Sequence, residues 1–140
     1  AAIAFVALII FVIGFLWFAW GVFRRWLRHQ LHDTHDRKFV QEEWKKVQVL
    51  ARTNNEASLQ LAVMQADKLF DHLLKSMGMP GSTLGERLKA ACYKYPELKQ
   101  VWWAHKVRNN IVHEPGGHST RKLHQAVNEF ESAFKKLGAL

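Results

Sequence analysis

The stretch EASLQLAVMQADKLFDHLLKSM, residues 56–77, decides the fold predicted for this chain. Its apolar residues recur every three or four positions, which is the spacing that places side chains on one face of an α-helix. Asp67 and Asp71 lie four positions apart on the flank of that face, where we expect them to pair with basic residues from elsewhere in the chain. The apolar face consists of Leu59, Val63, Ala66, Leu69, Phe70, Leu73, Leu74 and Met77.

A second amphipathic helix is predicted directly before this stretch, over residues 39–52. It ends at the polar break of residues 53–55, whose asparagines can cap the start of the next helix. Its apolar positions also follow helical spacing, so it can pack on the central helix. These positions are Val40, Trp44, Val47 and Ala51.

Three more helices are predicted after the central stretch. Thr83 and Glu86 form a capping box that starts the first of them. The second covers residues 98–113, and Ser119 or Thr120 can cap the last. Apart from residues 98–113, the residues expected in the core are Leu84, Leu88, Ala91, Cys92, Leu123, Val127, Phe130, Phe134 and Leu137.

The fold class predicted from these patterns is all-α. No segment shows sustained apolar–polar alternation, so no strand is expected. The loops are short, which favours an antiparallel bundle of about five helices over residues 39–140. Cys92 is the only cysteine, so no internal disulfide can form, and a lone thiol suits a reducing compartment.

Residues 1–23 are uninterruptedly apolar and carry no charge. At about 1.5 Å per residue a helix of this length spans the roughly 30 Å hydrocarbon core of a bilayer. We therefore predict a single transmembrane helix in the cell membrane. Basic residues follow the run and none precedes it, so the positive-inside rule places the C-terminal domain in the cytoplasm. The residues expected at the membrane interface are Trp17, Trp20, Arg24, Arg25, Trp26 and Arg28.

Part of the net charge of +8 is concentrated directly after the apolar run of residues 1–23. Residues 24–38 form a basic connector that we expect to be attracted to anionic headgroups, and residues 39–140 form the helical domain. Three histidines of the connector recur every third residue, but each step turns about 60° around a helix, so they do not converge on a metal ion. No metal and no cofactor is expected. These histidines are His29, His32 and His35.

The helix predicted over residues 98–113 carries the candidate site. Arg108 lies about 80° from the centre of its apolar stripe and should be half-buried, where an unpaired guanidinium is costly. We therefore expect it to meet Glu86, Asp67, Asp71 or a group across an oligomer interface. The stripe is predicted to be Gln100, Ala104, Val107 and Ile111, with Val101 and Trp103 at its edges. The exposed flank is predicted to carry Trp102, His105, Asn109 and His113.

This stretch resembles a known family. Residues 108–113, Arg-Asn-Asn-Ile-Val-His, are similar to the R-x4–6-H motif of the HEPN superfamily, with Asn109 as the polar residue after the arginine. The sequences GERLK (85–89), WAHKVRN (103–109) and HEP (113–115) also resemble uncharacterised bacterial membrane-anchored proteins with a HEPN-like domain. The resemblance implies a homodimer in which the helices carrying Arg108 and His113 face each other.

Two functions stay open from the sequence. The first is a membrane-anchored cytoplasmic module for binding or assembly, with Trp102, His105 and Lys106 as contacts to RNA or a protein partner. The alternative is a metal-independent endoribonuclease tethered to the inner face of the membrane. The resemblance then implies that Arg108 stabilises phosphate charge, Asn109 orients the site and His113 acts as general acid and base, giving 2′,3′-cyclic phosphate ends.

A structural reading of the same residues competes with both functions. Arg108 can serve as an ion-pair partner, Asn109 as a surface residue and His113 as a residue favoured at a helix C-terminus. Arg108 and His113 also point about 140° apart on an unbroken helix. A catalytic site would therefore need a second copy of the chain or a frayed helix end.

Overall fold

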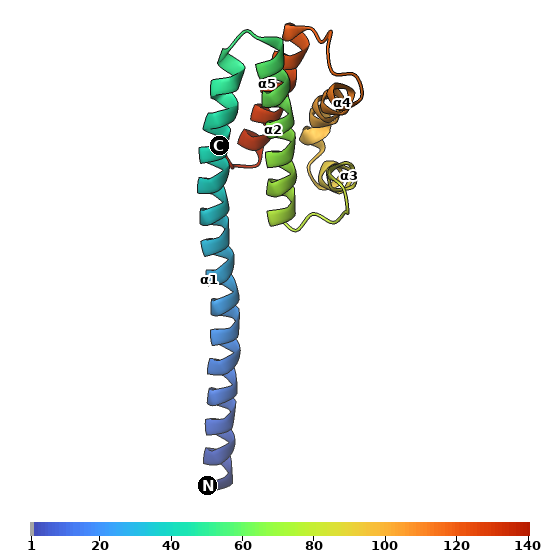
Figure 1. Cartoon of the computed structure of the whole chain (residues 1–140). Helices are drawn as coiled ribbons and strands as arrows, with labels where there is room; N and C mark the ends of the chain where they lie inside the picture. The colour runs from blue at the N-terminus through green and yellow to red at the C-terminus, as the bar shows by residue number, and fades with distance from the viewer. Residues whose placement is uncertain (1) are drawn as a thin grey trace. The chain divides into compact units, whose positions relative to one another are not determined.

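The computed structural model describes the backbone of residues 2–140 and the side chains of residues 3–7, 9–23 and 36–140. No strand occurs in residues 2–140, so the all-α prediction is confirmed. Figure 1 shows the order of the helices along the chain. They are α1 (Ala2–Arg52), α2 (Glu56–Ser76), α3 (Leu84–Lys94), the 3-10 helix η1 (Pro96–Leu98), α4 (Lys99–His113) and α5 (Thr120–Lys136).

The chain divides into two units, residues 1–35 and residues 36–140. The first unit holds a helical segment, Ile3–Phe23, with a mean hydropathy of 2.7 and no buried part. This segment is long and apolar enough to cross a membrane, judged by its length and composition. Trp17 and Trp20 are exposed. The side chains of Arg24, Arg25, Trp26, Arg28, His29, His32 and His35 lie outside the described residues.

A helix boundary was predicted between the basic connector and residues 39–52, but helix α1 does not end there. It continues to Arg52 as one element. Residues 24–38 contain neither glycine nor proline, so no residue in this segment terminates a helix. Residues 39–52 are therefore the last turns of α1 and not a separate helix. Their predicted core face is confirmed, because Val40, Trp44 and Val47 are buried.

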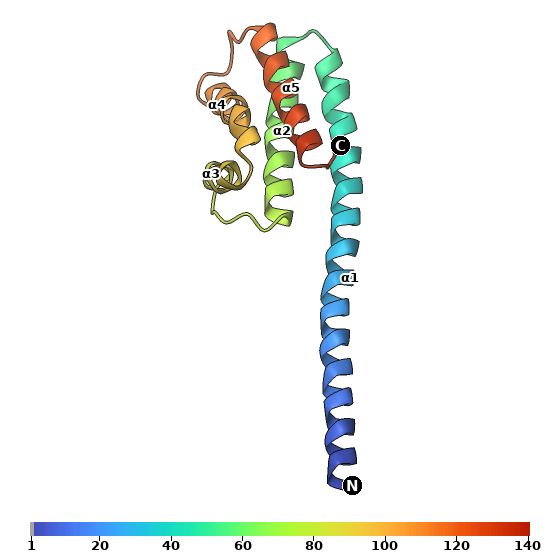
Figure 2. The ribbon, with the colours of Figure 1, turned by 180° about the vertical axis from the view of Figure 1, so that it is seen from behind.

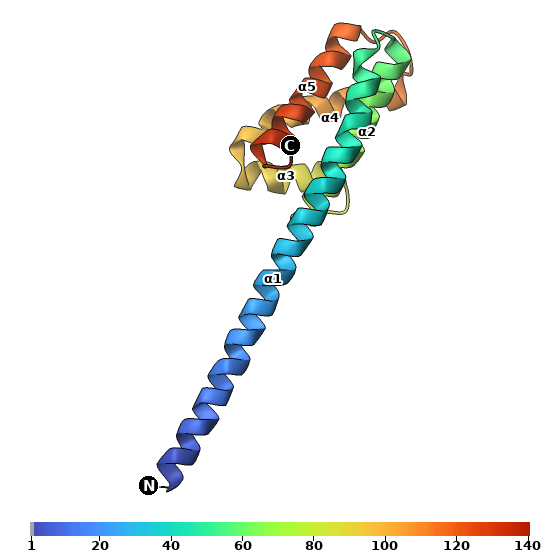
Figure 3. The same cartoon turned by 90° about the vertical axis from the view of Figure 1, so that its left-hand side faces the viewer.

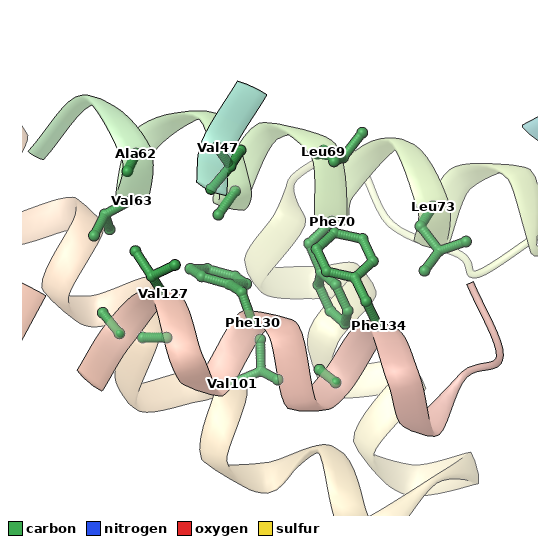
Figure 4. Close-up of a cluster of buried hydrophobic side chains, with 14 of the residues drawn as sticks. Val47, Ala62, Val63, Leu69, Phe70, Leu73, Val101, Val127, Phe130 and Phe134 are labelled. Atoms are coloured by element: carbon green, nitrogen blue, oxygen red, sulfur yellow. The ribbon is translucent and has the colours of Figure 1, made fainter. Parts of the chain in front are cut away.

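The core of residues 36–140 lies between α2 and α5. Phe70 of α2 lies 5.2 Å from Phe134 of α5 between ring centroids, in an edge-to-face arrangement. The Trp44 ring also lies 5.2 Å from that of Phe134. Figure 4 shows Phe130 and Phe134 pointing from α5 toward α2. Such aromatic pairs add about 0.5–1.5 kcal/mol beyond their burial. Helix α5 also packs against α4, as seen from behind in Figure 2.

The N-termini of α2 and α3 are capped by the predicted side chains. The Asn55 side chain accepts a hydrogen bond from the amide of Ala57 at 2.8 Å. The Thr83 hydroxyl accepts one from the amide of Glu86 at 3.3 Å, and the Glu86 carboxylate reaches back to the amide of Ser82 at 2.5 Å. The side-chain cap predicted for α5 is absent at Ser119, which makes no capping hydrogen bond.

Two details of α4 differ from the prediction. The predicted start at Leu98 belongs to η1, and α4 begins at Lys99. Gln100, placed in the apolar stripe by its angle, is exposed, whereas Val101 is buried. The buried side chains at this end of α4 are Leu98, from the separate 3-10 turn, and Val101. They occupy the core in place of Gln100. Ala104, Val107 and Ile111 are buried as predicted.

Candidate functional site

A buried carboxylate joins α2 to the helix that carries the motif. The side chain of Asp67 is 6% exposed, and its Oδ1 lies 2.7 Å from Nδ1 of His105. Its Oδ2 lies 3.4 Å from Nε of Arg108. Burying a carboxylate without partners costs several kcal/mol, and these two contacts offset that cost. Of the three acids predicted as partners of Arg108, the structure selects Asp67.

Asn109 completes this group of side chains. Its Oδ1 accepts a hydrogen bond from Nη1 of Arg108 at 3.1 Å, and its Nδ2 lies 3.3 Å from Nε2 of His105. A neutral imidazole fits both of its contacts when Nδ1–H donates to Asp67 and Nε2 accepts from Asn109. We call Asp67, His105, Arg108 and Asn109 the Asp67 cluster.

Of the four residues predicted on the exposed flank of the motif helix, His113 is exposed, but Trp102, His105 and Asn109 are partly buried. The prediction is wrong above all for His105. Its side chain is 12% exposed and lies deeper than that of Arg108, which is 37% exposed. The prediction followed the apolar residues of α4 alone, and the buried acid on α2 was not visible in that pattern. Trp102 is half-buried beside His105, with 6.3 Å between their ring centroids. Lys106 is exposed.

His113 does not join the cluster. It is exposed in the last turn of α4. That turn is intact, because the amide of Glu114 donates to the carbonyl of Asn110 at 2.8 Å. Five helical residues rotate the direction of a side chain by about 140°. Arg108 and His113 of one chain therefore point to different sides of α4.

A buried arginine was missed in the sequence. The Arg87 side chain is 7% exposed and donates to Oδ1 of Asp71 at 2.7 Å. It also donates to the carbonyl oxygens of Gly81 and Ser82, so it ties the α2–α3 loop to α2. Its position three residues after Leu84, on the inner face of α3, was the available signal.

Asp71 has an ionisation set by these neighbours. Burial opposes its charge, but hydrogen bonds from Arg87 and Lys75 outweigh burial and lower the pKa of Asp71 below its ordinary 3.8. The Lys75 ammonium lies 2.8 Å from its Oδ2. The prediction that both acids of α2 pair with basic residues is confirmed, since Asp71 pairs with Arg87 and Asp67 with Arg108.

A hollow of about 660 Å³ lies over the Asp67 cluster and the Asp71–Arg87 pair, between α2, the start of α3 and α4. Asp67, Arg108 and Asn109 line it together with the exposed Lys68. Within the described residues, no three His, Cys, Asp or Glu side chains are grouped so that they could hold a metal ion. The side chains that line this hollow supply hydrogen-bonding groups and positive charge.

No family model matches this chain, and no curated protein or solved structure matches it significantly.

Proposed function

We propose that this protein is a membrane-anchored module for binding and assembly, with a HEPN-like helical domain on the cytoplasmic side. The apolar segment Ile3–Phe23 supports the anchor. The arginines that follow it support the cytoplasmic orientation of the domain. The position of residues 108–113 on the penultimate α-helix of a helical unit supports the HEPN-like assignment.

One observation carries the choice of a binding module over an enzyme. Asp67 holds both His105 and Arg108 inside a single chain. The motif arginine is therefore part of the contact that fixes α4 on α2, and its charge is offset by a buried acid. A cation paired with a buried acid holds the helix that carries it in place. An interaction surface on α4 requires such a fixed helix.

The first partner we propose is a second copy of the chain, bound through α4. Val112 is 51% exposed on α4, next to the motif residues. Leu61 and Met64 are exposed on α2 and line the same hollow as Arg108. Exposed apolar side chains grouped beside half-buried polar ones are typical of a protein interface. RNA or another protein would then bind to the dimer.

The second candidate is an endoribonuclease. It is favoured by the part of Arg108 that stays accessible beside Asn109 in the hollow. Arg108 of one protomer would stabilise the scissile phosphate, and His113 of the partner subunit would transfer the proton. The RNA 2′-hydroxyl would attack the adjacent phosphorus while the bond from phosphorus to the 5′-oxygen of the next nucleotide breaks. The products would be a 2′,3′-cyclic phosphate and a 5′-hydroxyl end, which takes up the proton. No metal enters this mechanism.

Incubation of the purified full chain with fluorescent RNA in EDTA separates the two candidates. We expect a dimer that does not cleave RNA. Cleavage that Arg108→Ala and His113→Ala each abolish, while Lys45→Ala leaves it unchanged, would establish the nuclease instead. Lys45 is an exposed lysine of α1 outside the hollow, which makes it a matched control for the loss of charge.

The anchor is tested independently of the partner. We expect the chain to stay in membranes after an alkaline wash and to have its C-terminal domain digested by protease only in inverted vesicles. Release by the wash would rule out the transmembrane segment. Digestion in right-side-out cells would rule out the cytoplasmic orientation and leave the anchor intact.

A further inference from the structure

Helix α3 lies across one end of the unit formed by residues 36–140. Figures 1 and 3 show it next to the end of α2, running across the direction of that helix. The chain enters the unit at the same end, because Asp36 lies 3.6 Å from His72 in the C-terminal half of α2. Helix α5 also finishes there, with Gly138 next to Arg37.

The outer side of α3 combines an exposed aromatic ring with lysines. Leu84, Leu88 and Ala91 face the core, and Tyr93 points in the opposite direction with 92% exposure. Lys89 and Lys94 are exposed beside it. The loop before α3 continues this surface through an open hollow of about 790 Å³. We call Met79, Pro80, Lys89, Tyr93 and Lys94 the α3 face.

The charge around the α3 face is mainly positive. Two acids of this end are already paired, Asp71 with Arg87 and Lys75, and Glu131 with Lys135. The Glu86 carboxylate caps α3. Glu97 is an exposed acid here. Apart from Lys75 and Lys135, which are paired with Asp71 and Glu131, the exposed basic residues of the same end outside the α3 face are Arg37, Lys38 and Lys136.

We infer that the α3 face is a second contact with the bilayer and binds anionic lipid headgroups. Lys89 and Lys94 would meet the headgroup phosphates, and the Tyr93 ring would lie at the interface, where amphipathic aromatic rings are favoured. This inference rests on the proposed anchor. Only twelve residues separate Phe23 from Asp36, about 18 Å as a helix, so the anchor would keep this end close to the headgroups.

Fluorescence quenching by lipids tests this contact on the full chain. Cys92→Ser removes the only thiol, and Tyr93→Cys then accepts an aromatic fluorophore that takes the place of the tyrosine ring at position 93. The chain is placed in nanodiscs that contain a headgroup quencher and either phosphatidylcholine alone or an equal mixture with phosphatidylserine. We expect quenching in the mixture and much less in phosphatidylcholine. It should disappear in 1 M salt, where the Debye length falls to about 3 Å.

Matched variants show whether the α3 face is responsible. Lys89→Glu with Lys94→Glu should abolish the quenching at position 93. Arg52→Glu with Arg121→Glu reverses two exposed charges at the opposite end of the unit and should leave it unchanged. A fluorophore on Asn54→Cys, in the α1–α2 loop at that opposite end, should not be quenched.

Two outcomes overturn the inference in different ways. A chain that resists the alkaline wash but shows equal quenching at positions 93 and 54, or none at 93, refutes the α3 face and leaves the anchor standing. A chain that the wash releases refutes the anchor, and the inference falls with it.

Discussion

Nδ1 of His105 lies 2.7 Å from Oδ1 of Asp67, and this contact joins α4 to α2. Both side chains are nearly buried, so water contributes little to satisfying either of them. The other oxygen of the same carboxylate, Oδ2, lies 3.4 Å from Nε of Arg108 and forms an ion pair with it. One acid therefore fixes two residues of the motif helix, and the first two predictions below depend on this geometry.

Replacing Asp67 with asparagine should destabilise the domain. Asp67→Asn keeps the shape of the side chain but removes the charge that faces Arg108. Hydrogen bonds to charged groups contribute about 1.5–3 kcal/mol, so we expect a loss of about 2 kcal/mol in the free energy of unfolding. Denaturant unfolding followed by near-ultraviolet circular dichroism measures this loss. Glu42→Gln, at an exposed position of α1, is the control, and an equal effect of both changes would contradict the central role of Asp67.

The two histidines of the motif region should differ in their effect on stability. His105→Ala leaves the buried Asp67 with one partner fewer and should lower the melting temperature by several degrees, since about 1 kcal/mol corresponds to 4–8 °C for a domain of this size. His113→Ala removes an exposed side chain and should change stability by less than about 0.5 kcal/mol. Thermal melts of both variants compare them directly. A larger effect of His113→Ala would show that the burial of His105 is wrong.

Gly81 should tolerate alanine less well than Gly116. Both have a positive φ, 144° and 138°, so the backbone penalty for a side chain is similar. A Cβ on Gly81 would lie 2.7 Å from the backbone nitrogen of Arg87, whereas a Cβ on Gly116 would meet nothing within 4 Å. We expect Gly81→Ala to cost at least about 1 kcal/mol more than Gly116→Ala, within the range of overpacking changes. Equal unfolding midpoints would mean that the α2–α3 loop can move away from α3.

The contribution of Asp71 to stability should be lost in acid. Because its folded-state pKa is lowered, its stabilising charge is fully present above the ordinary value of 3.8 and is lost as the pH falls from there through the folded-state pKa. Asp71→Asn stays neutral at every pH. The stability difference between the wild type and this variant should therefore be constant near neutral pH and shrink below about pH 4.

Subtracting the stability of Asp71→Asn from that of the wild type at each pH removes the effect of Glu86, a neighbouring acid. Hydrogen bonds from the backbone of Ser82, against the opposing effect of burial, lower the pKa of Glu86 below its ordinary 4.5, and Glu86 also loses its charge in acid. Both proteins contain Glu86, and its contribution cancels when one is subtracted from the other. A difference that persists unchanged in acid would show that Asp71 stabilises the fold without its charge.

A charge on the outer side of α4 should weaken dimerisation. Val112→Glu would bury an unpaired carboxylate in the proposed interface, and we expect at least a tenfold weaker dimer, about 1.4 kcal/mol. Light scattering of the detergent-solubilised chain over a range of concentrations measures this change. Val49→Glu, at an exposed valine of α1, should leave the mass unchanged. A monomeric wild type would remove the basis for a composite site.

The apolar pattern of the sequence was sufficient to predict most of the core, although Met77, Cys92 and Leu137 are only partly buried. Leu59, Val63, Ala66 and Phe70 all lie on the predicted face of α2 and are all buried. Their burial depends mainly on spacing, because any apolar surface of the bundle can cover them. The cap at Asn55 was predictable for a similar reason, since it involves only residues next to each other in the chain.

The polar cluster was only partly predictable. The need of Arg108 for an acid followed from its angle on α4, but the position of His105 depends on where a residue 38 positions earlier lies in space. Arg87 was missed because two of its acceptors are carbonyl oxygens of the α2–α3 loop. The direction of a loop carbonyl depends on the backbone angles at Gly81, which the sequence does not specify beyond favouring glycine.

The single thiol of the chain gives this protein a natural reporter of local opening. Cys92 lies half-buried on α3 against the core, and burial raises the pKa of its thiol, against the opposing effect of a hydrogen bond with Trp102. Alkylating reagents attack the thiolate, so modification in the closed state is slow. An increase in the rate of alkylation at a fixed pH would therefore report a movement that exposes Cys92, without any introduced label.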